Sequence, residues 1–197
     1  IENISPFTLA FLRWLFVWII LMPFTYKEIY NLKKIILSNF KLLFILGLSS
    51  VFLYSALTYK ALNYTQVINA SLFNTAVPAT IILVSFLLKI EKTNIFQLSG
   101  LLISTLGILA IVTKLDLNIL LSLDFNTGDL YMIIAIISWG VYSAFLKKRN
   151  FQISLLALVQ IICTFGLLML APAFLIELNQ GYSVDINFKL FYILLYV

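Results

Sequence analysis

A polar face inside an apolar segment is the clearest chemical feature of the sequence. Residues 67–88 carry no charged side chain, yet Ser71, Asn74, Thr75 and Pro78 recur there at spacings of three and four. On a helix such positions share one face. Pro78 has no N–H to pair with the Asn74 carbonyl, so in a lipid environment that carbonyl needs protein, water or a ligand. We interpret the segment as a kinked helix lining a polar cavity. The alternative is hydrogen bonding across a helix–helix interface.

Further candidates for contact with a solute lie inside other apolar runs. Tyr54 and Thr58 are four residues apart and Trp139 and Tyr142 are three apart, so each pair shares a helix face. Gln160 lies in the following run. Aromatic rings stack on planar or apolar ligands, but they also pack in cores and against lipid. Both interpretations stay open for these five residues.

Arg13 is a charge placed inside an apolar run. It stands several residues into the run at 7–24. A charge at the centre of a membrane helix costs about 2.5–3.5 kcal/mol, so its position asks for a reason. Arg13 is a candidate for binding an anionic group of a substrate. Extension to the outer interface and bonding to carbonyls of a neighbouring helix are the alternatives.

Composition decides the class of protein. The chain has 197 residues, of which 62% are hydrophobic and 11% charged, and its mean hydropathy is +1.06. Soluble domains are roughly 45–50% apolar and about 25% charged. There is too little polar surface here to cover a water-soluble globule, so the sequence predicts an integral membrane protein. The net charge of +5 then reflects basic loops rather than nucleic-acid binding.

Groups for catalysis or metal binding are scarce. The sequence has no histidine and a single cysteine, Cys163, which lies in an apolar run and is interpreted as a core residue. The acidic residues lie in predicted loops or at the ends of spans, and no GxxxxGK[ST] motif occurs. We therefore expect no metal, no cofactor and no enzymatic activity.

The apolar runs have the length of membrane-spanning helices. About 20 residues of helix cross the roughly 30 Å hydrocarbon core, and these runs do not alternate as membrane strands do. The runs occupy residues 7–24, 42–59, 67–88, 95–113, 130–146 and 153–176, and a seventh begins near residue 190. The sequence thus predicts an all-α polytopic transmembrane helix bundle.

Charge in the loops predicts the orientation. Lysine and arginine are concentrated in the loops at 25–41, 89–94 and 147–150, and the loops between them are acidic. By the positive-inside rule the basic loops are cytoplasmic, which places residue 1 on the outer side. The expected location is a bacterial cytoplasmic (inner) membrane.

The chain repeats itself. The segment at 4–24 aligns with 153–173 at an offset of 149 residues, and 39–46 aligns with 187–194 at nearly the same offset. This offset spans five helices, and an odd number inverts the second copy in the membrane. Inverted repeats are typical of secondary transporters, whose substrate site lies at the repeat interface near the midplane.

The repeat leads to a domain prediction. Residues 1–127 are predicted to be a first repeat missing its first helix, and residues 128–197 the start of a second, inverted and truncated repeat. The parent protein would then have ten helices in two inverted five-helix repeats, of which about six and a half are present.

One small-residue face completes the candidates. Gly100, Ser104 and Gly107 recur at spacings of four and three in the run at 95–113. Small residues allow membrane helices to approach closely. We interpret this face as a tight packing surface.

The pattern of motifs resembles the EamA-like family of the drug/metabolite transporter superfamily. The resemblance covers nearly the whole chain, including "LAFLRW" (9–14) with Arg13 and the segment at 128–149 with Trp139. The other matching residues are Ala61, Leu62, Tyr64, Thr65, Pro78, Glu91, Gly100 and Gly107. Lys92 stands where the family usually has arginine. The resemblance implies ten helices, cytoplasmic termini, and export or exchange of small metabolites by alternating access.

These observations together favour a secondary transporter in the lipid bilayer that carries a small-molecule substrate. An integral-membrane enzyme acting on lipid-linked substrates and a non-transporting membrane scaffold are the alternatives. A homodimer is left open, and no nucleic-acid partner is expected.

Overall fold

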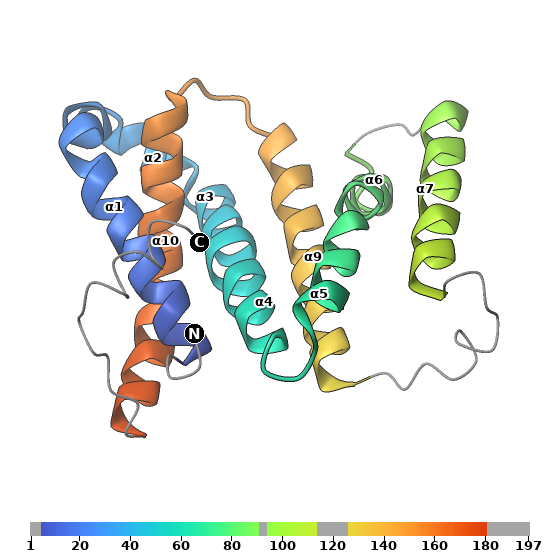
Figure 1. Ribbon diagram of the computed structural model, residues 1–197. Coiled ribbons are helices and arrows are strands. Elements are labelled where there is room, and N and C mark those ends of the chain that lie inside the picture. Colours follow the sequence, from blue (N-terminus) through green and yellow to red (C-terminus); the bar gives the residue numbers. More distant parts are fainter. Residues whose placement is uncertain (1–4, 91–93, 114–125, 181–197) are drawn as a thin grey trace. The chain divides into compact units, whose positions relative to one another are not determined.

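The computed structural model describes residues 5–90, 94–113 and 126–180, and within these ranges the elements are helices joined by short connections (Figure 1). The predicted seventh run, Glu91 and Lys92 lie outside the described residues. All six remaining apolar runs are helical. The all-α polytopic fold class is therefore confirmed.

The helices follow in chain order. They are α1 (Pro6–Asn31), α2 (Lys33–Ser38), α3 (Phe40–Gly47), the π-helix η1 (Leu48–Ser55), α4 (Ala56–Ala61), α5 (Val67–Thr75), α6 (Val77–Leu87), α7 (Ile95–Thr113), α9 (Thr127–Lys147) and α10 (Leu155–Asn179). Four described segments are long and apolar enough to cross a membrane: α1, the continuous helix Phe40–Ala61, α9 and α10. The bent pair α5 and α6 makes a fifth.

The basic segment at 25–41 differs from the predicted loop. α1 continues to Asn31, and α2 follows after Leu32 alone. This stretch contains neither glycine nor proline after Pro23, and its isoleucine, leucine and lysine side chains tolerate a helix. The apolar run at 7–24 is therefore shorter than α1 itself. Hydropathy marks the residues that lie in hydrocarbon, and a helix can continue beyond them.

The chain divides into two compact units, which are described separately. Unit 1 comprises residues 1–59 and 150–197, and unit 2 comprises residues 60–149. The predicted repeats at 1–127 and 128–197 are divisions of the sequence, and they stay a prediction.

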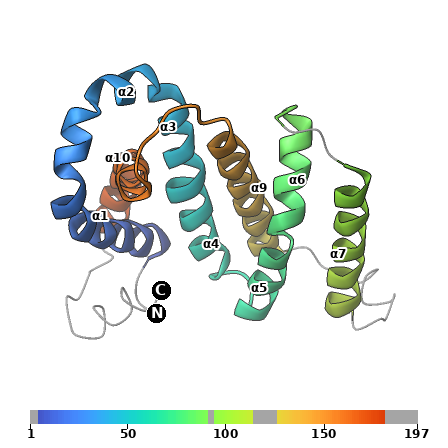
Figure 2. The same ribbon diagram turned by 90° about the horizontal axis from the view of Figure 1, so that it is seen from above.

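In unit 1, α1 and α10 run antiparallel side by side (Figures 1 and 2). On α10, Gly166 lies against η1 so closely that an added Cβ would meet Val51 Cβ at 2.2 Å. On α3, a Cβ at Gly47 would meet Phe165 Cβ at 2.7 Å. Two glycines therefore let α10 approach the continuous helix at 40–61 at close range.

In unit 2, α9 packs against α5 and α6. Gly140 of α9 lies against Thr80 and Val84 of α6, and an added Cβ would stand 3.0 Å from Val84 Cγ2. α9 begins with a capping box, in which the Asn126 side chain accepts from the Asp129 N–H at 2.9 Å and the Asp129 side chain accepts from the Asn126 N–H at 3.2 Å.

Candidate functional site

The polar segment that opened the sequence analysis is broken near its middle. α5 ends at Thr75, α6 starts at Val77, and the two helices are bent by 46°. Pro78 lies in the first turn of α6, where its missing N–H is tolerated. The kink predicted from Pro78 is therefore present, as a complete break rather than a bend within one helix.

The hydroxyl groups around this break bond to their own helix. Ser71 Oγ donates to the Val67 carbonyl at 2.8 Å, and Thr75 Oγ1 donates to the Leu72 carbonyl at 2.6 Å. Ser71, Thr75 and Pro78 are exposed within the described part of the chain, and Asn74 is half-buried. Such back-bonded hydroxyls keep acceptor capacity for a further donor.

Behind the break, α6 carries two buried hydroxyl residues, Thr80 of the polar stretch and Ser85, which were not among the candidate site residues. Thr80 Oγ1 donates to the Ala76 carbonyl at 2.9 Å, and the same carbonyl accepts the Thr80 N–H at 3.0 Å. Ser85 is 2% exposed, and its Oγ has no hydrogen-bond partner among the described residues. Thr80 could have been proposed from the sequence, because it belongs to the same apolar run as Ser71 and Asn74. The burial of Ser85 could not, because it depends on how the helices pack.

Trp139 and Tyr142 lie together on α9, as their spacing predicts. Their ring centroids are 5.0 Å apart and the rings are tilted by 46°. Both residues are half-buried. The pair offers an aromatic surface in unit 2, the same unit as the α5–α6 break.

Arg13 in unit 1 is held by a tyrosine. Its guanidinium donates to Tyr59 Oη and lies 5.8 Å from the centre of the Trp14 ring. Trp14 Nε1 in turn donates to Ser55 Oγ at 2.8 Å. Of the three explanations for Arg13, hydrogen bonding to a neighbouring helix is present, although the partner is a phenol instead of a carbonyl. An arginine has five N–H donors, so this contact leaves donors for a further acceptor.

Tyr54 and Thr58 are separated by the end of the π-helix. Tyr54 lies in η1 and Thr58 in α4, and both are half-buried. π-helical turns are rare in proteins, and those that occur are often found at functional sites. Thr58 Oγ1 is buried with no hydrogen-bond partner in the described ranges. Sequence reasoning had no signal for η1, because its widened turns leave no mark in hydropathy.

Gln160 takes part in the contact between α1 and α10. Its Nε2 donates to the Trp18 carbonyl at 3.2 Å, and Trp18 Nε1 donates to Thr164 Oγ1 at 2.9 Å. Gln160 is 2% exposed, and its Oε1 has no hydrogen-bond partner among the described residues. The side chain thus bonds across a helix pair while one acceptor stays unused.

The predicted residues fall into two groups, one in each unit. Unit 1 contains Arg13, Tyr54, Thr58 and Gln160; unit 2 contains Ser71, Asn74, Thr75, Pro78, Trp139 and Tyr142. Within unit 1, Tyr59 is a partner of Arg13 that the sequence analysis missed. It lies 46 residues away along the chain, and no local pattern connects the two.

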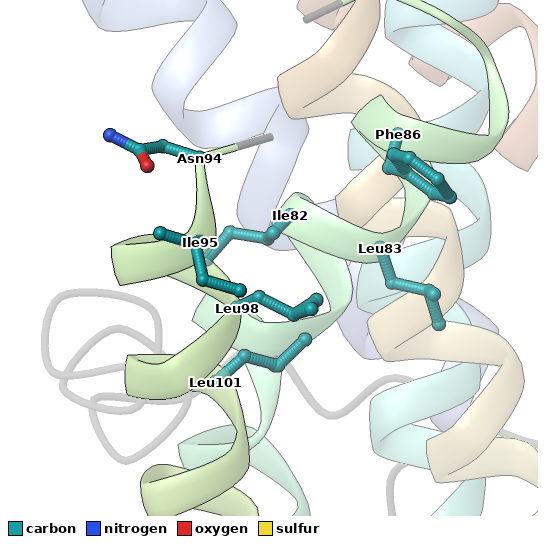
Figure 3. A pocket seen from close by; sticks show the side chains of 7 residues that line it. All are labelled: Ile82, Leu83, Phe86, Asn94, Ile95, Leu98 and Leu101. Carbon is teal, nitrogen blue, oxygen red and sulfur yellow. The ribbon is translucent and has the colours of Figure 1, made fainter. Parts of the chain in front are cut away.

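A separate cavity of about 310 Å³ lies between α6 and α7 in unit 2 (Figure 3). Six of its lining side chains are apolar, and the Asn94 amide points away from them (Figure 3). The lining residues are Ile82, Leu83, Phe86, Asn94, Ile95, Leu98 and Leu101. The cavity contains none of the predicted site residues, and its lining is suited to hydrocarbon rather than to a polar solute.

The small-residue face of α7 has no packing partner in the described part of the chain. A Cβ added at Gly100 or Gly107 would meet no atom within 4 Å, and Ser104 is exposed. The tight packing predicted for this face is therefore not present among the described residues.

The described helices, four long apolar ones and one bent pair, define a polytopic membrane protein. Comparison with known proteins places it more narrowly. The family model described as the EamA-like transporter family matches residues 1–113, so the chain belongs to the EamA-like transporter family. The chain is also 31% identical over 190 residues to a protein of Archaeoglobus fulgidus named an uncharacterized transporter. That alignment covers 96% of this chain and 63% of the relative, so the chain spans less than two thirds of the relative's length. No solved structure matches the chain.

Proposed function

We propose that the protein is a secondary transporter of small organic solutes, acting as an exporter or exchanger by alternating access. The observation that carries the proposal is the broken polar helix α5–α6 in a chain of this family. Discontinuous membrane helices are typical of substrate and ion sites in transporters, because their ends expose backbone groups. The orientation proposed from the basic loops puts residue 1 outside and residues 25–41, 89–94 and 147–150 in the cytoplasm.

Each unit carries its own set of proposed substrate-binding residues, and the two sets are assigned separately. In unit 2 we assign Asn74, Ser71, Thr75 and Pro78 at the break to polar contact. Ser71, Thr75 and Pro78 are exposed within the described residues, which supports this assignment over helix packing, because a packing face would be covered. Trp139 and Tyr142 supply an aromatic surface to the same solute.

In unit 1, considered by itself, we assign Arg13 to an anionic group of a solute, with Tyr59 orienting the guanidinium. Tyr54, Thr58 and Gln160 provide further polar contacts. Thr58 Oγ1 and Gln160 Oε1 support this, because buried polar atoms without a protein partner are rare and costly. A role for the carboxylates in catalysis is less well supported, since Glu28 and Glu177 both accept hydrogen bonds from helix N-termini.

The test uses the full-length protein reconstituted in liposomes, with labelled amino acids, nucleosides and small sugars as probes. Wild type is compared with Asn74→Leu and with Asn69→Leu. Asn69 is the matched control, because it lies on the same helix, is exposed, and points about 140° away around the helix axis.

Saturable uptake that is lost in Asn74→Leu and kept in Asn69→Leu supports both the transporter and the assigned site. Equal uptake in all three proteins keeps the transporter and refutes the role of Asn74. Absence of uptake for every probe, with folded protein in the vesicles, contradicts transport of these solute classes.

A further inference from the structure

One end of the α1/α10 pair is closed by a carboxylate from α10. Glu177 accepts hydrogen bonds from the N–H groups of Phe7 at 3.3 Å and Thr8 at 2.7 Å, and from Ser5 Oγ at 2.5 Å. The first residue of α1 is Pro6, which has no N–H. Phe7 and Thr8 are therefore the amides at the start of α1 that need a partner outside the helix, and Glu177 supplies it. Glu177 is 9% exposed.

The other end of the pair is closed by a carboxylate from α1. Glu28 Oε1 accepts from the Ser154 N–H at 3.0 Å, and its Oε2 accepts from Ser154 Oγ at 2.6 Å. Ser154 is the N-cap of α10, and its Oγ also accepts from the Ala157 N–H at 3.2 Å. Each helix thus uses a glutamate near its C-terminus to hold the N-terminus of the other.

These two contacts are equivalent in the sequence repeat. The offset of 149 residues that aligns Ser5 with Ser154 also aligns Glu28 with Glu177. The two serines lie within the aligned segments 4–24 and 153–173, whereas the two glutamates lie beyond them. In a two-fold arrangement, a contact from the first copy to the second is matched by the equivalent contact from the second copy to the first. The two ends therefore share a serine–glutamate contact that is repeated in inverted orientation. The amides bound differ, because Glu177 accepts from Phe7 and Thr8, whereas Glu28 accepts from Ser154.

The middle of the pair is held differently from its ends. Trp18 of α1 donates to Thr164 and accepts from Gln160 there, and both partners are on α10. Hydrogen bonds inside hydrocarbon cannot be exchanged for bonds to water, so the middle resists separation. The carboxylate caps lie at the helix ends, where water replaces a lost partner at lower cost. Motion about a fixed middle would open one end while the other stays closed.

We propose that Glu28 and Glu177 are opposing positioning residues, whose caps hold the two ends of the α1/α10 pair and are released alternately. This inference deepens the proposed function and rests on it for its link to transport. Each intact cap favours the state closed at its own end. The pair then exchanges between two states, one open at the Glu28 end and one open at the Glu177 end. Weakening one cap shifts this equilibrium toward the state that is open at that cap and closed at the other.

The test measures this equilibrium without any substrate. Reporter substitutions Leu9→Cys and Leu158→Cys are made separately in full-length Cys163→Ala protein in nanodiscs. Leu9 and Leu158 are aligned by the same offset, are buried, and lie near opposite ends of the pair. A small water-soluble thiol reagent reaches both membrane faces, and its labelling rate reports exposure of each end.

Each reporter is combined with Glu177→Gln and with Glu28→Gln, which keep size and remove charge. We expect Glu177→Gln to raise labelling at position 9 several-fold to about tenfold and to lower it at position 158, with the reverse for Glu28→Gln. The double substitution should return both rates toward wild type. If a Gln variant does not fold, Ser5→Ala or Ser154→Ala is used instead, since each removes the serine hydroxyl that bonds to the glutamate. Ser154→Ala also removes the acceptor of the Ala157 N–H.

The decisive observation is whether the labelling rate falls at the reporter at the far end, away from the weakened cap. A rise at the near end with no fall at the far end means local fraying, and it overturns the proposal. A rise at both ends means general destabilisation, and unchanged rates mean that the caps hold nothing; each of these also overturns it. A rise in labelling rate at one end with a fall at the other supports the proposal even when no probe is transported. Failure of the proposed transport function is therefore recognised separately, in the uptake assay.

Discussion

Among the glycines that the structure describes, Gly166 is the one where an added methyl group would meet the nearest atoms. A Cβ at this site would lie 2.2 Å from Val51 Cβ and 2.3 Å from Val51 Cγ1. Non-bonded carbons are normally about 3.5–4.0 Å apart, so α10 or η1 would have to shift by roughly 1.5 Å. Rotation of the Val51 side chain does not help, because its Cβ is fixed to the backbone.

The expected magnitude follows from two opposing effects. Overpacking a core costs about 1–3 kcal/mol, and the fixed atoms here place Gly166→Ala at the upper end of that range. Alanine regains up to about 1 kcal/mol over glycine in a helix. We therefore expect Gly166→Ala to lower the free energy of unfolding by about 2 kcal/mol.

The assay is reversible unfolding of the full-length protein in mixed micelles with a denaturing detergent, followed by circular dichroism. Gly100→Ala is the matched control: it is also a helical glycine, but nothing lies within 4 Å of its added Cβ, so no loss is expected. Adding Val51→Gly to Gly166→Ala should recover part of the loss, because it removes the opposing atoms. A Gly166→Ala protein as stable as wild type would refute the close contact.

Two further predictions concern single polar contacts. Tyr59→Phe removes the acceptor of Arg13, and we expect a loss of about 1.5–3 kcal/mol in the same unfolding assay, since hydrogen bonds to charged groups fall in that range; an unchanged stability would mean that Arg13 has found another acceptor. Asn126→Ala removes the N-cap of α9 and should cost about 0.5–2 kcal/mol, whereas Asn179→Ala at the exposed end of α10 should stay within about 0.5 kcal/mol of wild type. Equal losses in the two asparagine variants would show that the capping box contributes nothing particular.

The spans could be predicted because apolar length is a property of consecutive residues. All six predicted runs within the described residues are helices, and Pro78 correctly marked the place where one of them breaks. The helical segment after residue 25 was missed, since hydropathy marks where lipid ends rather than where a helix ends. The π-helix η1 was also missed, because packing rather than composition widens its turns.

The candidate site was predictable as a set of residue types and only partly as a set of contacts. The spacing of Trp139 and Tyr142 placed their rings together, because three residues along a helix bring side chains to one face. Spacing could not pair Arg13 with Tyr59, since they lie on different helices. The assignment of these residues to a substrate stays a prediction.

The glutamate caps show which features follow from residue order along the chain and which depend on how the helices pack. The sequence determined the helices, the membrane class and an offset that aligns Glu28 with Glu177, since these depend on residue type and order along one chain. It did not determine that Glu28 meets Ser154, 126 residues away, or that Glu177 meets Ser5, 172 residues away. A carboxylate bonds to whichever helix end lies beside it, and only the antiparallel packing of α1 and α10 brings those ends together.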